Sequence, residues 1–360
     1  MKTITVGTDD HSYPVHIGKG LRFRVESLLP RDYQKVLIVT DSNVGNLYLN
    51  DVIHAFTKGQ QVHVYIIPAG EQSKNLSEFE HIHTFGIEKG LDRKSLIIAL
   101  GGGVVGDLAG FVAATYMRGI DYIQMPTTIL AHDSSVGGKV AINHPRGKNM
   151  IGQFYQPKTV IYDLETIESL PVREVRSGFA EVIKHAFIAD RQLLFTLLQE
   201  MESMEHIDPG LLQYALTRGI EIKSHIVEQD ERDQGVRHFL NFGHTLGHAL
   251  ESELGYGTLT HGEAVAIGMW FALKVSENIF SISLPVKPYE YWLQKMDYPL
   301  NIGNVKLEHL IDLMKTDKKS TGGQIRMVLL KDLELPKVVS LHDEELRQML
   351  RIFIHGGMKE

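Results

Sequence analysis

Short β-branched runs alternate with helical segments along the first half of the chain, and this alternation constrains the fold more than any other feature. Three such runs predict buried strands, at Lys35–Thr40, Val62–Ile67 and Ser95–Leu100. Each is followed by helical spacing, at Gly45–Lys58, Leu76–Lys89 and Val104–Met117. Further strands are expected at Thr3–Val6, Tyr13–Ile17, Tyr122–Met125 and Thr159–Tyr162. Strands joined through helices require right-handed crossovers, so we expect a mostly parallel sheet.

The pattern changes near Asp163–Pro171, after which helical spacing dominates. Helices are predicted at Arg173–Ile188, Arg191–Glu205, Pro209–Glu228, Gly235–Leu254, Glu263–Ser276 and Asp343–Phe353, with one strand at Gln324–Leu330. A chain of 360 residues is long enough for two cores. We therefore predict an α/β N-terminal Rossmann-like domain over residues 1–170 and a mainly α-helical domain over residues 171–360. A cleft between the two is the expected ligand site.

Composition excludes several classes of protein. The chain has no cysteine, so disulfides, thiolate zinc sites and cysteine nucleophiles are excluded. A formal net charge of −7 without a long basic run argues against a nucleic-acid partner. The most apolar segment, Ser95–Met117, contains three consecutive glycines and Asp107, so it does not predict a membrane span. The N-terminal residues have no apolar core of signal-peptide length, and we expect a cytoplasmic protein.

The glycine-rich stretch Gly101–Asp107 (GGGVVGD) follows a predicted strand and precedes a predicted helix. Its G-x-G-x-x-G spacing lets backbone N–H groups approach a pyrophosphate at a helix N-terminus. The spacing is also compatible with tight packing of a helix on a strand. Asp41, at the end of the first strand of the alternating unit, is the better candidate for ribose hydroxyls, because no acidic residue ends a strand at the usual distance after the glycines. We interpret the region as a nucleotide site with a non-standard layout.

The stretch Pro126–Asn149 is long, polar and punctuated by glycine, and is expected to be a functional loop. It offers Asp133, Lys139, Arg146, Lys148 and Asn149. Two glycines before Lys139 let backbone and ammonium approach one anion, which favours a phosphate site. A solvated surface excursion is the alternative.

Three histidines near the middle of the helical half predict a metal site. His244 and His248 are four residues apart, which places both rings on one face of a helix, and His261 opens the next helix. Neutral imidazole is a common ligand for zinc and related metals. Hydrogen-bonded core or surface histidines are the alternative. Thr245 follows His244, so the glutamate base of an HExxH metalloprotease is missing.

Glu181 is a candidate for the carboxylate ligand of such a site. It lies in the apolar helix SGFAEVIKHAFI on one stripe with Lys184 and His185. A carboxylate there is costly unless it is paired or bound to metal, and an ion pair with Lys184 is the alternative. Glu plus two His with an open position is typical of a catalytic metal.

Basic and polar residues surround the histidine helix. Arg237, Asn241, His244 and His248 are spaced four, three and four, which predicts one shared helix face suited to a cleft wall. Lys223 precedes them, and the run Lys315, Lys318 and Lys319 is interpreted either as a solvated turn or as a phosphate clamp.

Six motifs together resemble the 3-dehydroquinate synthases, of the sugar phosphate cyclase group: GGGVVGDLAGF, MPTTILAHDSSVGGKVAIN, GKNMIG, SGFAEVIKH, LNFGHTLGHALE and HGEAVAIGM. The resemblance extends in order from about Asp41 to Lys319. It implies conversion of 3-deoxy-D-arabino-heptulosonate 7-phosphate to 3-dehydroquinate and phosphate, in the shikimate route to chorismate. It also implies catalytic NAD, a divalent metal (zinc or cobalt) and a homodimer.

The resemblance assigns roles residue by residue. The metal ligands would be Glu181, His244 and His261, with His248 beside them as a proton-handling group. The groups that grip the phosphate would be Lys139, Asn149, His248, Lys318 or Lys319, and Arg118 from across a dimer interface. The carboxylate and hydroxyls of the substrate would be held by Lys184, Lys223, Arg237 and Asn241.

The resemblance also implies a set of residues that hold NAD, to which the glycine motif adds Gly101 and Gly102. The set is Asp41, Asn43, Glu71, Lys74, Gly101, Gly102, Gly103, Val104, Val105, Asp107, Thr127, Thr128, Asp133, Ser134, Lys139 and Lys148. Within it, Asp133 and Lys148 would line both the nicotinamide and the substrate. His132 has no assigned role.

Two other functions are compatible with this layout. Another sugar phosphate cyclase, acting on a substrate without the carboxylate, is the nearest. A metal-dependent NAD polyol or alcohol dehydrogenase shares the domain plan but leaves the many cationic groups unexplained. A non-catalytic metabolite-binding protein is disfavoured by the full set of expected ligands.

Overall fold

The computed structural model describes residues 1–9, 11–57, 59–255, 257–303, 305–316 and 324–356. The chain forms two compact units, here called the first and the second unit. The first comprises residues Met1–Leu170 and Lys223–Arg232, and the second Pro171–Ile222 and Asp233–Glu360. The predicted domains, 1–170 and 171–360, differ from this division in the segment 223–232. Among the described residues, no helix is both long and apolar enough to cross a bilayer.

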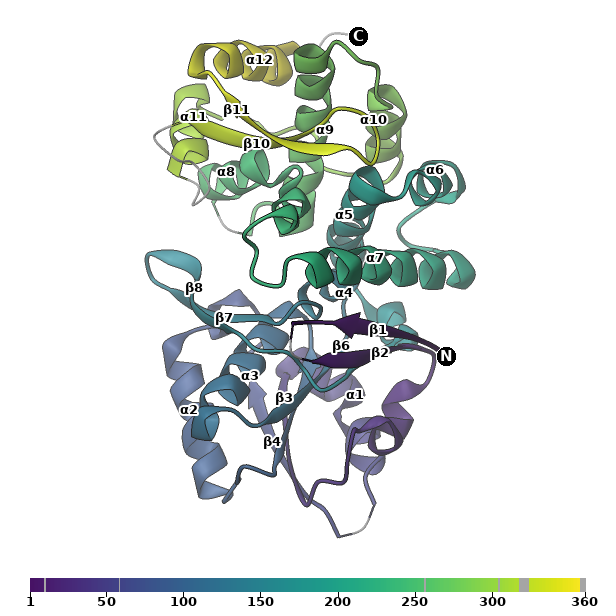
Figure 1. The fold of residues 1–360 in the computed structure, drawn as a ribbon, viewed down its shortest axis with the longest axis vertical. Coiled ribbons are helices and arrows are strands. Elements are labelled where there is room, and N and C mark those ends of the chain that lie inside the picture. Colours follow the sequence, from purple (N-terminus) through teal and green to yellow (C-terminus); the bar gives the residue numbers. More distant parts are fainter. Residues whose placement is uncertain (10, 58, 256, 304, 317–323, 357–360) are drawn as a thin grey trace. The chain divides into compact units, whose positions relative to one another are not determined.

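The first unit is built on a seven-stranded sheet of order β1-β2-β9-β6-β5-β3-β4 (Figure 1). The strands are β1 (Lys2–Gly7), β2 (Ser12–Gly18), β3 (Lys35–Asp41), β4 (Gln61–Ile67), β5 (Leu96–Gly101), β6 (Asp121–Pro126) and β9 (Val160–Asp163). Only β1 and β2 pair antiparallel in this sheet. The predicted parallel α/β fold is therefore confirmed. The strand order reverses between β3 and β5, which makes their carboxyl ends the topological switch point.

Side chains alternate along the central strands and bury two faces of the sheet. Leu37 and Val39 enter one core with α2 (Leu76–Glu88) and α3 (Gly103–Thr115), on one side of the sheet in Figure 1. Val36 and Ile38 enter the other core with α1 (Ser42–His54) and the 3₁₀ helix η1 (Leu21–Leu28). Short 3₁₀ helices complete the unit: η2 (Glu71–Ser73), η3 (Tyr116–Arg118) and η4 (Leu164–Ser169). Burial on both faces explains why these strands have apolar sequences without polar alternation.

The prediction that Pro126–Asn149 is an irregular loop is wrong. The segment forms α4 (Ala131–Ser134) and β7 (Lys139–His144), and it enters β8 (Gly147–Phe154), which pairs antiparallel with β7. Val140 and Ile142 of β7 are fully buried in the core beside α3. The hairpin forms because these two alternating residues pack on the helix, a tertiary effect that the polar sequence does not reveal.

The second unit is mainly helical, as expected. It contains α5 (Val172–Ala189), α6 (Arg191–Glu200), α7 (Pro209–Gln229), η5 (Val236–Asn241), α8 (His244–Leu254), α9 (His261–Phe280), α10 (Val286–Lys295), α11 (Leu307–Thr316) and α12 (Asp343–Gly356). The C-terminal residues of α7 belong to the first unit. β10 (Ile325–Leu330) and β11 (Pro336–Leu341) form an antiparallel hairpin. α10, α11 and β11 had not been predicted.

The predicted single helix Gly235–Leu254 is wrong, because the chain breaks between η5 and α8. Gly243 there has φ 83°, a left-handed conformation that glycine adopts without strain. Arg237 and Asn241 therefore lie in η5, and the helix face expected to join them to His244 and His248 does not exist. Phe242, between η5 and α8, is fully buried. The apolar spacing of the sequence therefore continues across the break, which is why one helix was predicted.

Glycines let α9 approach its two neighbours very closely. A Cβ atom at Gly262 would lie 1.9 Å from the carbonyl oxygen of Ser177 in α5, and one at Gly268 would lie 1.9 Å from that of Gly243 before α8. A Cβ at Gly247 in α8 would lie 3.1 Å from the backbone of Val265. The three helices that carry Glu181, His244 and His261 are thus held together backbone to backbone.

We expect Gly268→Ala to destabilise the protein, because its methyl group would overlap a backbone oxygen that cannot move unless α8 moves. A loss of roughly 3 kcal/mol or more in the free energy of unfolding is expected. Gly210→Ala in α7 is the control: its methyl would meet only the exposed side chain of Asp208, at 2.9 Å, and should change stability by less than about 1 kcal/mol. Denaturant unfolding measures both, and equal stabilities would contradict the packing argument.

Candidate active site

Three histidine side chains of the second unit converge. His244 and His248 lie one turn apart on α8, and His261 is the first residue of α9. One ring nitrogen from each lies within 4.8 Å of the others. The ring of His261 has its centroid 5.2 Å from that of His244 and 5.7 Å from that of His248. The spacing of the two helix residues and the position of the third therefore produce the cluster that the sequence predicted.

Glu181 joins this cluster from α5. Its Oε1 lies 3.8 Å from Nε2 of His244 and 3.6 Å from Nε2 of His261, and its side chain is 2% exposed. Its Oε2 accepts a hydrogen bond from Nζ of Lys184, which is also buried. The two roles considered for this carboxylate are therefore compatible: one oxygen pairs with the lysine while the other faces the imidazoles.

The donor set fits a divalent metal of the zinc or cobalt kind. Ligand atoms around a tetrahedral zinc lie about 3.3 Å apart, because each bond is roughly 2.0–2.1 Å long. The carboxylate–imidazole separations of 3.6 and 3.8 Å need only a small contraction to reach that value. Two imidazoles and one carboxylate also leave a coordination position for a substrate oxygen. His248 is also part of this cluster and is more exposed than His244 and His261.

Electrostatics act differently on the two candidate histidine ligands. Burial, followed by repulsion from Lys184, lowers the pKa of His244 well below its ordinary value. Burial also acts to lower the pKa of His261, but hydrogen bonds to Glu181 and Glu251 outweigh it and raise that pKa to about 9. Carboxylates on both sides of the His261 ring thus favour a positive charge at this place, whether on a proton or on a metal.

Glu251 is the residue near this cluster that sequence reasoning missed. It lies on α8, is buried, and accepts a hydrogen bond from Nδ1 of His261 at 3.1 Å. The available signal was its position seven residues, or about two turns, after His244 on the same helix. That spacing places the carboxylate on the helix face of the histidine.

The residues expected to hold the carboxylate of the substrate are divided between the units. Arg237 in η5 is 2% exposed, and Asn241 donates from Nδ2 to the carbonyl of His238 at 2.9 Å. Lys223 belongs to the first unit, where its Nζ lies 2.9 Å from Oδ2 of Asp133 and donates to the carbonyl oxygen of the same residue. Asp133 and Lys223, far apart in sequence, are thus neighbours.

The switch point of the sheet carries the residues expected to hold a nucleotide. Asp41 ends β3, and its Oδ1 accepts hydrogen bonds from the backbone N–H groups of Asn43 (2.8 Å) and Val44 (3.0 Å) at the start of α1. Gly102, between β5 and α3, is the N-cap of α3. A Cβ at Gly102 would lie 3.1 Å from Thr128, and one at Gly103 would lie 3.2 Å from Ser134. The predicted strand, glycine turn and helix are confirmed here.

A buried lysine connects the glycine-turn helix to the β7–β8 hairpin. Nζ of Lys74 donates to Oδ2 of Asp107 at 2.5 Å and to Oδ1 of Asn149 at 2.6 Å. Asn149 has a left-handed backbone, with φ 56°, and its N–H donates to Oδ1 of Asn143. Asn143 in turn donates from Nδ2 to Oε1 of Glu71 at 2.7 Å. Five of the predicted or neighbouring polar residues therefore form one network.

The remaining predicted residues are more exposed or outside the described part of the chain. Lys139 and Lys148 are exposed on the hairpin, and Arg118 is exposed in η3. Met117 and Arg118 both have left-handed backbones, with φ 49° and 69°, a strain often found at functional sites. Thr127 is an exception: it directly follows β6, is buried, and donates its N–H to the carbonyl of Gly101. Lys318 and Lys319 lie outside the described residues.

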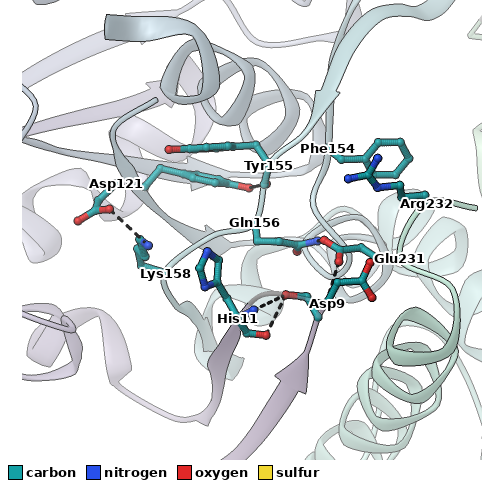
Figure 2. A pocket seen from close by; sticks show the side chains of 11 residues that line it. Asp9, His11, Asp121, Phe154, Tyr155, Gln156, Lys158, Glu231 and Arg232 are labelled. Atoms are coloured by element: carbon teal, nitrogen blue, oxygen red, sulfur yellow. Dashed lines mark hydrogen bonds and ion pairs between the residues drawn. The ribbon is translucent and has the colours of Figure 1, made fainter. Parts of the chain in front are cut away.

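The first unit also has a pocket of about 330 Å³, lined by other residues than those predicted for the site (Figure 2). Asp9 and His11, from the turn between β1 and β2, line it together with Asp121, Lys158 and Glu231. Its polar groups interact with one another: the backbone N–H of Asp9 donates to Oε2 of Glu231 at 3.0 Å, and Nζ of Lys158 lies 3.7 Å from Oδ1 of Asp121. None of the predicted site residues that the structure describes lines it.

We expect Lys74→Met to destabilise the protein in a pH-dependent way. Burial raises the pKa of Asp107, and Lys74 opposes that rise. Without the cation the folded-state pKa rises further, so ionisation penalises the folded protein once the pH exceeds the unfolded value of about 3.9. The deficit relative to wild type should be small near about pH 4 and reach roughly 3 kcal/mol by about pH 7.

Thermal or denaturant unfolding at several pH values measures this difference. Lys94→Met removes an exposed lysine from the same unit and is the matched control, for which we expect no pH-dependent deficit. A deficit for Lys74→Met that shrinks as the pH rises would contradict the assignment.

The fold and motifs agree with comparisons to known proteins. Two family models match, the N-terminal part of 3-dehydroquinate synthase over residues 64–177 and its C-terminal part over residues 178–320. The 3-dehydroquinate synthase of Oceanobacillus iheyensis is 53% identical over 355 residues, which cover 98% of each chain. That of Bacillus pumilus is 50% identical over 354 residues, or 97% of each chain.

Solved structures give the same fold. A 2-deoxy-scyllo-inosose synthase, in complex with carbaglucose-6-phosphate, NAD+ and Co2+, is 27% identical with a TM-score of 0.88, and the match covers 97% of this chain and 99% of that one. Glycerol dehydrogenase from Schizosaccharomyces pombe shares the fold at 15% identity, with a TM-score of 0.62 over 96% of this chain and 92% of that one. The resemblance found in the motifs is confirmed, and the chain belongs to the 3-dehydroquinate synthase family.

Proposed function

We propose that this chain is a phosphate-eliminating lyase that converts 3-deoxy-D-arabino-heptulosonate 7-phosphate to 3-dehydroquinate and phosphate. The observation that carries the proposal is the convergence of Glu181, His244 and His261 from three helices, within a chain of this family. The sibling cyclase and dehydrogenase alternatives are not favoured, because relatives at 47–53% identity over nearly the whole chain are 3-dehydroquinate synthases.

NAD and a divalent metal, zinc or cobalt, are the proposed cofactors. When bound, the metal polarises the hydroxyl that is oxidised, and NAD takes up a hydride and returns it later in the same turnover. Glu181, His244 and His261 would hold the metal. The neighbouring Lys184 would hold a hydroxyl of the substrate from its place beside Glu181.

The switch point is the proposed place for NAD. Backbone N–H groups at the start of α3 suit its pyrophosphate. Asp41 at the end of β3, with Asn43 in the first turn of α1, suits ribose hydroxyls. The other members of the proposed set are Glu71, Lys74, Val104, Val105, Asp107, Thr127, Thr128, Asp133, Ser134, Lys139 and Lys148. Lys74 has an additional role in this proposal, since it opposes the rise that burial causes in the pKa of Asp107.

Cationic and amide groups are the proposed phosphate clamp. Lys139, Asn149 and His248 would donate to the phosphate, together with Lys318 or Lys319 and with Arg118 of a second copy of the chain. Donors placed on a leaving phosphate stabilise the charge that develops on it as the carbon–oxygen bond breaks. Because the leaving phosphate can itself accept the proton of the adjacent carbon, no further side-chain base is needed for this step. A homodimer in the cytoplasm is part of the proposal.

Lys223, Arg237 and Asn241 are the proposed carboxylate site. A guanidinium presents paired donors that match a carboxylate, and the side chain of Arg237 is held rigidly by its burial. This carboxylate site would distinguish the proposed substrate from the substrates of sibling cyclases, which have no carboxylate. Asp133, in contact with Lys223, would orient the lysine toward substrate.

The expected reaction is tested by phosphate release from the heptulosonate, with and without a chelator. Phosphate should appear continuously in the presence of a catalytic amount of NAD, without net gain in NADH absorbance, and should stop when the metal is removed. The same preparation should release no phosphate from sedoheptulose 7-phosphate. Steady NADH production from a simple polyol would favour the dehydrogenase instead.

His261→Ala should abolish turnover and bound metal together, because one of three ligands is lost. His309→Ala is the matched control, since His309 is exposed on α11 and pairs with Glu253. We expect one metal ion per chain in wild type and in this control, measured by elemental analysis after removal of free metal. Full metal content in His261→Ala would refute the ligand set.

A further inference from the structure

Glu251 is a buried carboxylate for which the proposed reaction has no role. Its side chain is 7% exposed, and its Oε2 lies 3.1 Å from Nδ1 of His261. The other nitrogen of the same ring, Nε2, lies 3.6 Å from Oε1 of Glu181. The imidazole is therefore placed between two carboxylates, one at each ring nitrogen. A carboxylate is costly to bury unless its partners compensate it, so the hydrogen bond from His261 stabilises the buried Glu251.

The contact determines which nitrogen of His261 carries the proton. An ionised carboxylate only accepts hydrogen bonds, so Nδ1 must be the donor. A neutral ring then has its lone pair on Nε2, the nitrogen that faces Glu181 and lies near His244. In this neutral form two acceptors would face each other across 3.6 Å, an arrangement that a cation between them stabilises, whereas without a metal a proton on Nε2 joins them.

The position of Glu251 on α8 makes this effect specific. α8 contributes His244 to the cluster and, seven residues later, the carboxylate that holds the histidine from α9. Close packing of α8 on α9, at Gly247 against Val265, fixes the distance between the two groups. The same helix thus presents one ligand directly and orients another.

We propose that Glu251 is a positioning residue that fixes the tautomer and the ring orientation of His261 for metal binding. The inference rests on the proposed ligand set. Carboxylates that orient a ligating histidine through its second nitrogen also raise its basicity, and their loss typically weakens metal binding by about 10–100-fold. Glu251 touches neither substrate nor NAD in this proposal, so its removal acts through the metal.

Glu251→Ala and Glu251→Gln test the proposal. The dissociation constant of the full chain for Co2+ is measured by competition with a chelator, and the Co2+ absorption spectrum reports the geometry of its ligands. Glu251→Ala should weaken binding by about 10–100-fold. Glu251→Gln retains an acceptor oxygen without the charge, and should fall between Ala and wild type, with a loss of roughly threefold or more.

Glu253→Gln is the matched control. Glu253 lies two residues after Glu251 on α8 and pairs with the ring of His309, which is outside the histidine cluster. It should bind Co2+ with wild-type affinity. Circular dichroism checks folding; if Glu251→Ala does not fold, Glu251→Gln decides alone. Wild-type affinity in the folded Glu251 variant, or equal losses in Ala and Gln, would overturn the inference. The metal content of wild type and His261→Ala tests the ligand set separately.

Discussion

The distance between the backbones of α5, α8 and α9 controls the chemistry of the second unit. Glu181, His244 and His261 come from these three helices, and their side chains converge because the helix backbones pack closely. Gly262 and Gly268 on α9 provide this approach, since a Cβ atom at either position would lie 1.9 Å from a backbone oxygen of a neighbouring segment. Close backbone packing at these two glycines therefore sets the geometry of the three side chains.

Charged contacts fix the register of the same helices. The buried carboxylate of Glu263, two residues after His261, lies 3.0 Å from Nη1 of Arg176 on α5 and accepts from the N–H of Thr260 at 2.8 Å. These contacts hold the first turn of α9 against the helix that carries Glu181. Because breaking a buried ion pair leaves an uncompensated charge, α9 cannot slide along α5 without a large cost in free energy. Glycine contacts set the distance, and Glu263 sets the position along the axis.

Sequence patterns predicted the elements that depend on local periodicity. They failed for elements and contacts that are determined by tertiary packing. β3, β4 and β5 were predictable because strands buried on both faces have continuous apolar sequences. The β7–β8 hairpin was missed because few of its residues, Val140 and Ile142 with Ile151 packed against them, anchor it in the core. The break at Gly243 was missed because the apolar spacing continues through it. Glu251 was missed because its partner, His261, is brought to it by the turn between two helices.

Buried cations argue for the elimination chemistry over simple alcohol oxidation. Lys184, Lys223 and Arg237 have exposed fractions of 1%, 5% and 2%, far below what is usual for these residue types. A dehydrogenase needs a hydride acceptor and a Lewis acid, and this chemistry gives three further buried cations no role. Lys184 and Lys223 already pair with Glu181 and Asp133, and a substrate with a phosphate and a carboxylate would add further anionic partners when it binds. These cations would therefore make binding specific for a sugar that carries both a phosphate and a carboxylate. This agrees with the family to which the chain belongs.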